Sequence, residues 1–210
     1  MENIGALAEK YAGNGIFTAF DLETTGLDPQ KDRIVEIGAV KFDRLGLIAR
    51  FSTLVNPGIP MPPEAGKVNN ITDEMLAGKP SLDEVLPDFL RFIRDTVLTA
   101  YNAPFDCGFV NESLKVRYEK ARAAVPGGQG SLLDSLDNDA APGSGWTVQS
   151  LPNPVADTLA IAREVFPGKR SYKLQELAAE LQIPAAEAHR AEDDARLCME
   201  IFIRCLGGKG

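Results

Sequence analysis

Cysteine, histidine and tryptophan are scarce in this sequence. Its 210 residues include three cysteines, one histidine and one tryptophan. Cys107, Cys198 and Cys205 are odd in number and form no Cys-x-x-Cys pair, which argues against a disulfide framework or a cysteine-based zinc site. We therefore expect reduced thiols in a cytoplasmic protein. Cys198 and Cys205 recur at helical spacing among apolar residues, so they are predicted to pack in the core.

Long apolar runs and a leader sequence are also lacking. No run approaches the roughly 20 apolar residues that a membrane-spanning helix needs. Met1-Glu2-Asn3 lacks the basic start and the apolar core of a signal peptide. The length suits one domain over residues 1–210. Within it, Gly, Asp, Asn and Pro clusters predict a loop-rich insertion at about 119–153.

Basic residues are fewer than acidic ones. The chain has 22 Lys and Arg against 30 Asp and Glu, which leaves a net charge of −8. This balance argues against nucleic acid as a partner, unless some of the acids hold metal ions. Two bound divalent cations would bring the charge from −8 to −4. An enzyme that grips only the end of a strand also needs few phosphate contacts, so we expect weak, salt-sensitive binding.

An apolar run at residues 16–20 leads into two acids, Asp21 and Glu23, and then to Gly26. Side chains alternate along a strand, so the two carboxylates point to the same side and repel each other. No Lys or Arg lies between Ile16 and Gln30, which makes a divalent metal held by oxygen ligands the leading candidate for compensation. The alternative is a strand end with solvated acids. Gly26 permits a sharp turn and a close approach of another molecule.

The remaining pattern predicts an α/β domain around a mixed sheet. Asn56–Pro63 is interpreted as a loop, Thr72 and Ser81 as helix N-caps, and Asn102 as the N-cap of a helix that begins at Pro104. We expect further strands at 34–42, 48–55 and 97–101, and helices at 4–11, 71–76, 82–93, 104–118, 157–165, 174–181 and 191–206.

Two more acids occupy apolar helix faces. Asp106 shares its face with Phe109 and Val110, and Asp194 shares its face with Ala195 and Cys198. Buried carboxylates are costly when unpaired, so these two and the Asp21/Glu23 pair are predicted to converge on one site. Their charge suits two hard divalent cations, Mg²⁺ or Mn²⁺.

Two further polar residues, Glu36 and His189, are candidates for the neighbourhood of this site. Glu36 is an acid within an apolar run, placed either at the sheet margin or near the site. His189, the only histidine, precedes Asp194 by five positions, and we expect it on a loop where it can reach the metals as a general base.

Three segments resemble the exonuclease motifs of the DEDDh group of DnaQ-like 3′–5′ exonucleases, a family that includes the exonuclease domain of DNA polymerase III epsilon subunits. They are Asp21-Leu22-Glu23-Thr24-Thr25-Gly26, Asn102-Ala103-Pro104-Phe105-Asp106 and His189-x-x-x-x-Asp194. The resemblance implies a ribonuclease-H-like fold with a mixed five-stranded sheet. It also implies two metals on Asp21, Glu23, Asp106 and Asp194, with His189 as the base. Substrate contacts are implied for Leu22, Thr24, Thr25, Leu27, Asn102 and Phe105.

The sequence departs from the family pattern in places that bear on substrate choice. Tyr101 stands where the second motif often has His, and Asn69-Asn70 replaces a common His-Gly pair. The chain also ends soon after the last helix, which favours a stand-alone enzyme over a proofreading subunit.

The expected activity is release of nucleoside 5′-monophosphates from the 3′ ends of single-stranded DNA. The expected partner is a nucleic-acid end, together with a possible DNA polymerase or other repair protein. We expect neither a membrane nor a small organic cofactor. The alternatives are an RNA exonuclease of the same superfamily and a non-catalytic module that binds nucleic-acid ends.

Overall fold

A mixed five-stranded sheet forms the centre of the fold. The structure is a computed structural model, and it describes residues 3–124, 149–184 and 190–207. The strands follow the order β3-β2-β1-β4-β5, with β1 antiparallel to β2 and parallel to β4. This confirms the sheet type predicted from the sequence. The strands are β1 (Phe17–Thr24), β2 (Ile34–Asp43), β3 (Gly46–Leu54), β4 (Val97–Ala100) and β5 (Val155–Asp157).

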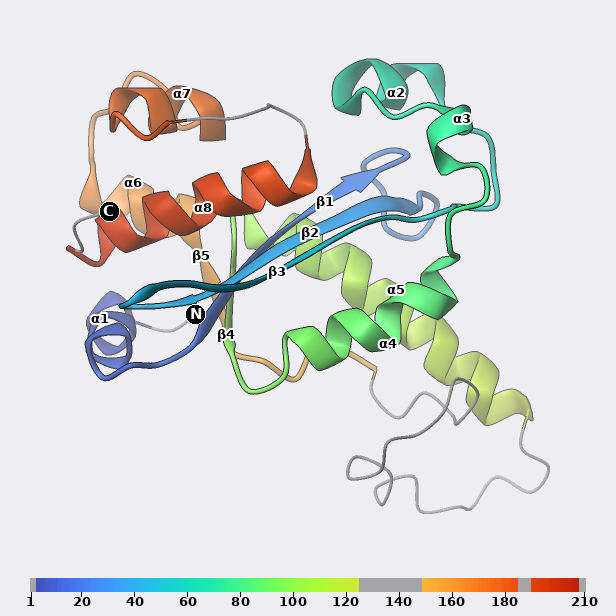
Figure 1. The fold of residues 1–210 in the computed structure, drawn as a ribbon, viewed down its shortest axis with the longest axis horizontal. Coiled ribbons are helices and arrows are strands. Elements are labelled where there is room, and N and C mark those ends of the chain that lie inside the picture. Colours follow the sequence, from blue (N-terminus) through green and yellow to red (C-terminus); the bar gives the residue numbers. More distant parts are fainter. Residues whose placement is uncertain (1–2, 125–148, 185–189, 208–210) are drawn as a thin grey trace.

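Helices cover both faces of this sheet. The long helix α8 crosses one face, with α6 and α7 beside it, whereas α4 and α5 lie on the other (Figure 1). The helices are α1 (Ile4–Ala12), α2 (Pro63–Asn69), α3 (Asp73–Leu76), α4 (Leu82–Phe92), α5 (Ala103–Ala124), α6 (Thr158–Val165), α7 (Leu174–Glu180) and α8 (Ala191–Cys205).

The central strand β1 distributes its side chains between these two layers. Phe17 and Ala19 pack into the core cluster that contains the apolar residues of α8, and Phe20 and Leu22 pack into the cluster beneath α4 and α5. Side chains alternate along a strand, so position 21 faces α8 again. The Asp21 side chain therefore points towards α8.

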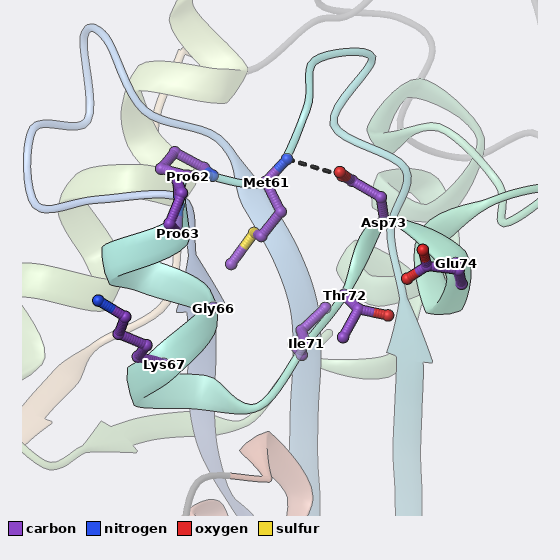
Figure 2. Close-up of a pocket in the computed structure, with 9 residues that line it drawn as sticks. All are labelled: Met61, Pro62, Pro63, Gly66, Lys67, Ile71, Thr72, Asp73 and Glu74. Atoms are coloured by element: carbon purple, nitrogen blue, oxygen red, sulfur yellow. Dashed lines mark hydrogen bonds between the residues drawn. The ribbon is translucent and has the colours of Figure 1, made fainter.

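Two elements were not predicted. The first is α2, for which no helix was predicted. It begins at Pro63, the end of the segment interpreted as loop, and this proline lies in its first turn, where a missing N–H costs no hydrogen bond. Together with the start of α3, this helix lines a shallow cavity of about 290 Å³, where the Met61 N–H donates to Asp73 (2.7 Å; Figure 2). The second is β5, whose three residues are too few to show a pattern.

The predicted insertion at 119–153 is partly helical. Helix α5 continues beyond the expected end near Tyr118 as far as Ala124. Residues 125–148 lie outside the described residues, so the single-domain organisation with a loop-rich insertion stays a prediction.

Helix caps follow the sequence patterns with one correction. Thr72 accepts from the N–H of Met75 (3.4 Å), and the Glu84 carboxylate accepts from the N–H of Ser81 (2.7 Å), as expected for these signals. Asn102 directly precedes α5, the predicted N-cap position, but its φ of 71° lies in the left-handed region and not in the extended one that is typical of an N-cap. The Asp157 carboxylate accepts from the N–H groups of Asn102 and Ala103 (3.2 and 3.4 Å), so the last residue of β5 supplies the side-chain hydrogen bonds at the start of α5.

The cysteines match the expectation of reduced thiols. All three are free, and Cys198 and Cys205 are buried in the cluster beneath α8. Burial raises the pKa of the Cys107 and Cys205 thiols to about 12, so both stay protonated at neutral pH. Among the described residues, none of the helices has the length and apolar character needed to cross a membrane.

Candidate metal and active site

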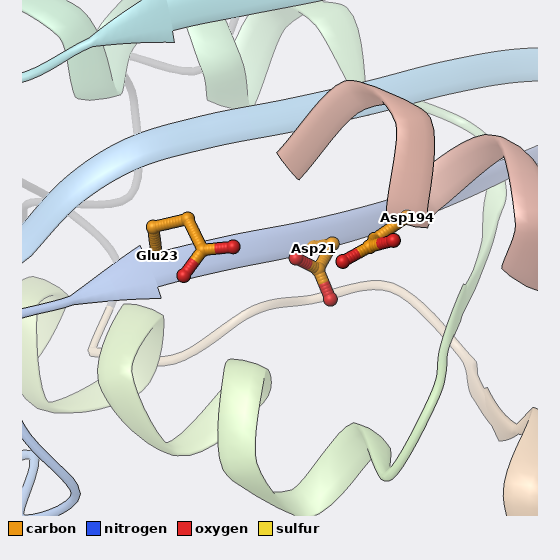
Figure 3. Close-up of side chains that lie close together, drawn as sticks. All are labelled: Asp21, Glu23 and Asp194. Carbon is orange, nitrogen blue, oxygen red and sulfur yellow. The ribbon is translucent and has the colours of Figure 1, made fainter. Parts of the chain in front are cut away.

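Three of the predicted acids meet between β1 and α8. Asp21 and Glu23 project from the same face of β1, and Asp194 from the first turn of α8 points towards them (Figure 3). Each offers a carboxylate oxygen, and these oxygens lie within 4.8 Å of one another. Asp194 is buried and the other two are half-buried. Oxygen donors at such spacing are the ligand type that hard divalent cations prefer.

The fourth acid, Asp106, enters the site from the opposite layer. It lies in the first turn of α5, is only 2% exposed, and accepts a hydrogen bond from the backbone N–H of Leu22 (3.1 Å). That bond fixes Asp106 against β1 between the positions of Asp21 and Glu23. The four acids predicted from the sequence thus converge from β1, α5 and α8.

The carboxylates disfavour one another's ionisation. Burial, and next the charge of Asp106, raise the pKa of Asp21 well above its usual value. Burial and the charge of Asp194 raise the pKa of Glu23 to about 7. Burial also raises the pKa of Asp106, although its hydrogen bonds from backbone N–H groups act in the opposite direction. A cation bound among these groups would relieve both the repulsion and the desolvation.

Gln175, which sequence reasoning missed, helps to orient Asp194. Its side-chain amide, on α7, donates to Oδ1 of Asp194 (2.5 Å). Asp194 thus bonds α7 while it offers an oxygen to the β1 acids, so α7 acts as a support for the site. No sequence signal pointed to Gln175, because a glutamine on a helix is usually solvated.

An ion pair between the buried Glu36 and the partly exposed Arg190 anchors the start of α8. Glu36, 1% exposed, lies directly opposite Glu23 in the β1–β2 register. The Arg190 guanidinium donates to it from Nη2 (2.6 Å) and Nε (3.2 Å), and the N–H of Ala191 is a third donor (3.3 Å). Glu36 is therefore at the site and not at the sheet margin. Arg190 also lowers the pKa of Glu23, against the larger effects that raise it.

Removal of this arginine is expected to loosen the site. Arg190→Ala would leave the Glu36 carboxylate buried with only the Ala191 N–H of these donors, which should cost about 1–3 kcal/mol of unfolding free energy. Urea denaturation would measure the loss, and Arg91→Ala, which removes an exposed surface ion pair, serves as control and should change little. Equal stability of the two variants would contradict an anchoring role for this ion pair.

The loop after β1 is held by its own polar groups. Thr24 donates to the carbonyl of Gly26 (2.6 Å), and the Thr25 hydroxyl accepts from the N–H of Arg33 (2.9 Å). A Cβ on Gly26 would lie only 2.4–2.5 Å from the atoms of the Asp32 carboxylate, too close for any other residue at this position unless that carboxylate shifts. Gly26 thus permits the loop to close on itself.

The residues predicted to bind substrate fall into two groups. Leu27, with 83% of its surface exposed, and Asn102 are open to solvent, and Phe105 is half-buried against Phe109. Leu22, Thr24 and Thr25 are buried, and the Leu22 side chain lies in the core cluster under α4 and α5. His189, the predicted base, lies outside the described residues.

Comparisons with known proteins agree with this geometry. Residues 18–202 match the family described as Exonuclease (RNase T). The DNA polymerase III subunit epsilon of Treponema pallidum is 47% identical over 188 residues, which cover 89% of this chain and 74% of that protein. The epsilon subunit of Aquifex aeolicus is 34% identical and is covered to 81%. A PolC-type DNA polymerase III from Clostridium perfringens is 35% identical, but the chain spans only 11% of its length.

Solved structures show the same fold. Exonuclease X in complex with 5′ overhanging duplex DNA matches with a TM-score of 0.60 and 24% identity, covering 92% of this chain and 94% of that one. An exonuclease I structure matches with a TM-score of 0.66 and 19% identity, over 92% of this chain and 42% of that one. The ribonuclease-H-like fold predicted from the three motifs is confirmed. On the family match and on its identity to the epsilon subunits, this chain belongs to the DnaQ-like exonuclease family.

Proposed function

We propose that this protein is a divalent-metal-dependent 3′–5′ exonuclease that releases nucleoside 5′-monophosphates from the 3′ ends of single-stranded DNA. The observation that carries the proposal is the convergence of Asp21, Glu23, Asp106 and Asp194 from three elements onto one site. A non-catalytic module that binds nucleic-acid ends would have no use for this costly cluster, whereas two-metal phosphodiester hydrolysis requires it.

The four carboxylates would hold two ions, Mg²⁺ or Mn²⁺. Such ions, when bound, lower the pKa of a water and stabilise charge on the attacked phosphoryl group and on the leaving 3′ oxygen. The charges of Asp106, Glu23 and Asp194 all raise the pKa of Asp21, so Asp21 would hold the ions together with these three acids. Gln175 and the Glu36–Arg190 pair keep Asp194 oriented while substrate enters.

The substrate end would be held by the exposed residues beside the carboxylates. Leu27 would wedge against the terminal base, and Asn102 and Phe105 would line the terminal pocket. For Leu22, Thr24 and Thr25 only backbone contacts are proposed, because their side chains are buried. The epsilon-subunit relatives support DNA as the substrate and a DNA polymerase as a partner. The cytoplasmic location stays a prediction.

His189 is proposed as the general base that accepts the proton of the attacking water. It adjoins Arg190, whose guanidinium is fixed to Glu36 opposite Glu23. His189→Ala is expected to lower kcat at least about 100-fold, the effect of losing a positioned base. Metal-induced thermal stabilisation should persist in this variant, since it keeps all four acids. A loss below tenfold would reject the assignment.

The activity itself is tested with matched DNA and RNA oligonucleotides of one sequence, labelled at the 5′ end, with Mg²⁺, Mn²⁺ or EDTA. A metal-dependent ladder that shortens from the 3′ end, faster on DNA than on RNA, is the expected result. Faster shortening of RNA would move the assignment to an RNA exonuclease. No cleavage of either strand with either metal would reject the proposal.

A further inference from the structure

A cationic cavity lies beside the candidate active site, in a chain that is acidic overall. It has a volume of about 670 Å³ and is formed by α6, the segment before α7 and the residues that precede α5. Arg163, Arg170 and Lys173 line it, and no Asp or Glu is among its lining residues. The cavity of Figure 2 is different, because its lining includes two acids, Asp73 and Glu74, and only one cation, Lys67. Three cations without an acid are unexpected at a net charge of −8.

We propose that this cavity binds the backbone phosphates of the single-stranded nucleic acid whose 3′ end occupies the active site. The inference rests on the proposed function, and it adds a second binding site that holds the strand rather than the terminal nucleotide. Phosphate neutralisation by Lys and Arg supplies most of the non-specific affinity for nucleic acid, and the four site acids cannot contribute to it.

The cavity shares its walls with elements that position the catalytic carboxylates. Asn102 lines it, and Asp106 follows one helical turn later on α5. Leu174 lines it as well, and the next residue, Gln175, hydrogen-bonds Asp194. A strand that leaves the site on this side would therefore meet the cavity within its first nucleotides.

Two tyrosines fix the segment between α6 and α7, which carries two of the three cations, Arg170 and Lys173. Tyr172 donates to the carbonyl of Phe166 (2.6 Å), and Tyr101 donates to the carbonyl of Tyr172 (2.6 Å). Tyr101 is the residue at which the second motif departs from the family pattern, so this departure ties the segment between α6 and α7 to the start of α5.

The cations themselves are available to a ligand. Arg163 lies over the ring of Tyr172, 5.7 Å from its centroid. Lys173 pairs with Glu176 at 3.4 Å, but both side chains are exposed, with 82% and 54% of their surfaces accessible. Exposed pairs of this kind contribute little, so a phosphate can replace the carboxylate. Arg170 is exposed too.

The test compares two triple variants that each remove three positive charges. One carries Arg163→Gln, Arg170→Gln and Lys173→Gln in the cavity. The control carries Lys79→Gln, Arg91→Gln and Arg94→Gln. All three are exposed; Lys79 lies before α4, Arg91 on it and Arg94 just after it. Binding of ten-nucleotide DNA and RNA strands of one sequence is measured by fluorescence anisotropy in EDTA, from low to moderate salt.

The cavity variant is expected to raise Kd at least tenfold at low salt for both strands. The slope of log Kd against log salt should fall by about 2, because each phosphate contact on a single strand contributes about 0.7. The control variant should stay within twofold. Equal weakening by both variants would show a general charge effect and overturn the proposal, as would a loss confined to one of the two nucleic acids.

A small substrate separates this inference from the proposed function. The p-nitrophenyl ester of thymidine 5′-monophosphate has no strand to reach the cavity, so its kcat/KM with Mn²⁺ should be unchanged in the cavity variant. If the unmodified protein cleaves neither this ester nor an oligonucleotide, the proposed function fails while the binding data still decide on the cavity. A matching loss on the ester in the cavity variant would instead point to damage at the active site.

Discussion

Asp21→Asn is expected to abolish cleavage and, at the same time, to stabilise the metal-free protein. Asp21 faces Asp106, Glu23 and Asp194, so its charge would be the common attraction for both proposed metals. Loss of that ligand should remove several kcal/mol of transition-state stabilisation, which corresponds to at least about a 1,000-fold fall in kcat/KM. Without metal, the same charge only repels its neighbours, so the amide should raise the Tm by roughly 3 °C or more.

The stability gain should depend on pH in a defined direction. The folded-state pKa of Asp21 is raised above the unfolded value, so its ionisation costs stability at pH values above the folded pKa. Below the unfolded value the carboxyl is protonated in both states and the cost disappears. The Tm difference between the variant and the unmodified protein in EDTA should therefore be large at pH 8 and shrink towards pH 4.

The control is Asp88→Asn, an exposed acid on α4 paired with Arg91. It should leave both the cleavage rate and the Tm nearly unchanged. Addition of Mn²⁺ should raise the Tm of the unmodified protein and of the control, because a ligand that binds only the folded state stabilises it. An active Asp21→Asn variant would refute the metal assignment, and an inactive one with a lowered metal-free Tm would refute the repulsion argument.

The four acids could be found from the sequence because their signals are local. Alternation along β1 places Asp21 and Glu23 on one side, and helical periodicity places Asp106 and Asp194 among apolar residues. A carboxylate in an apolar pattern is costly to bury unless something compensates its charge. Four such carboxylates therefore indicate one shared site. The mixed sheet was likewise predicted from the order of the elements along the chain, in which strands come first and a strand and helices then alternate.

The supports of the site could not be found in this way because they join distant parts of the chain. Glu36 and Arg190 are 154 positions apart, and either residue alone reads as an ordinary polar side chain. Gln175 reaches Asp194 only because α7 packs against α8. Asp157 bonds the start of α5 from the neighbouring strand β5, a contact that the local pattern around Asn102 does not show. Such contacts depend on tertiary packing that no short window contains.

Gly38→Ala should be the most damaging small substitution in the sheet. Gly38 lies opposite Asp21 in the β1–β2 register, and the first turn of α8 rests directly on it. A Cβ at this position would stand 2.0 Å from the backbone nitrogen of Glu192 and 2.1 Å from the carbonyl carbon of Ala191. Backbone atoms cannot swing aside as a flexible side chain does, so the start of α8 would have to move away from the sheet.

Displacement of α8 would also lower the activity, because Asp194 lies in the first turn of α8 and has to stay close to Asp21. We expect an unfolding free energy lower by about 3 kcal/mol or more, the upper range for overpacking. We also expect kcat/KM to fall about 100-fold, as for an ångström-scale misplacement of a catalytic group.

Gly108→Ala on α5 is the matched control. Its nearest neighbour would be the Pro29 ring at 4.0 Å, so the added methyl is tolerated and should stabilise the helix by up to about 1 kcal/mol. Denaturation and cleavage measured on both variants separate the close helix–sheet approach from any general effect of replacing glycine. A Gly38→Ala protein as stable and active as the Gly108→Ala protein would mean that α8 does not depend on this contact to bring Asp194 to the site.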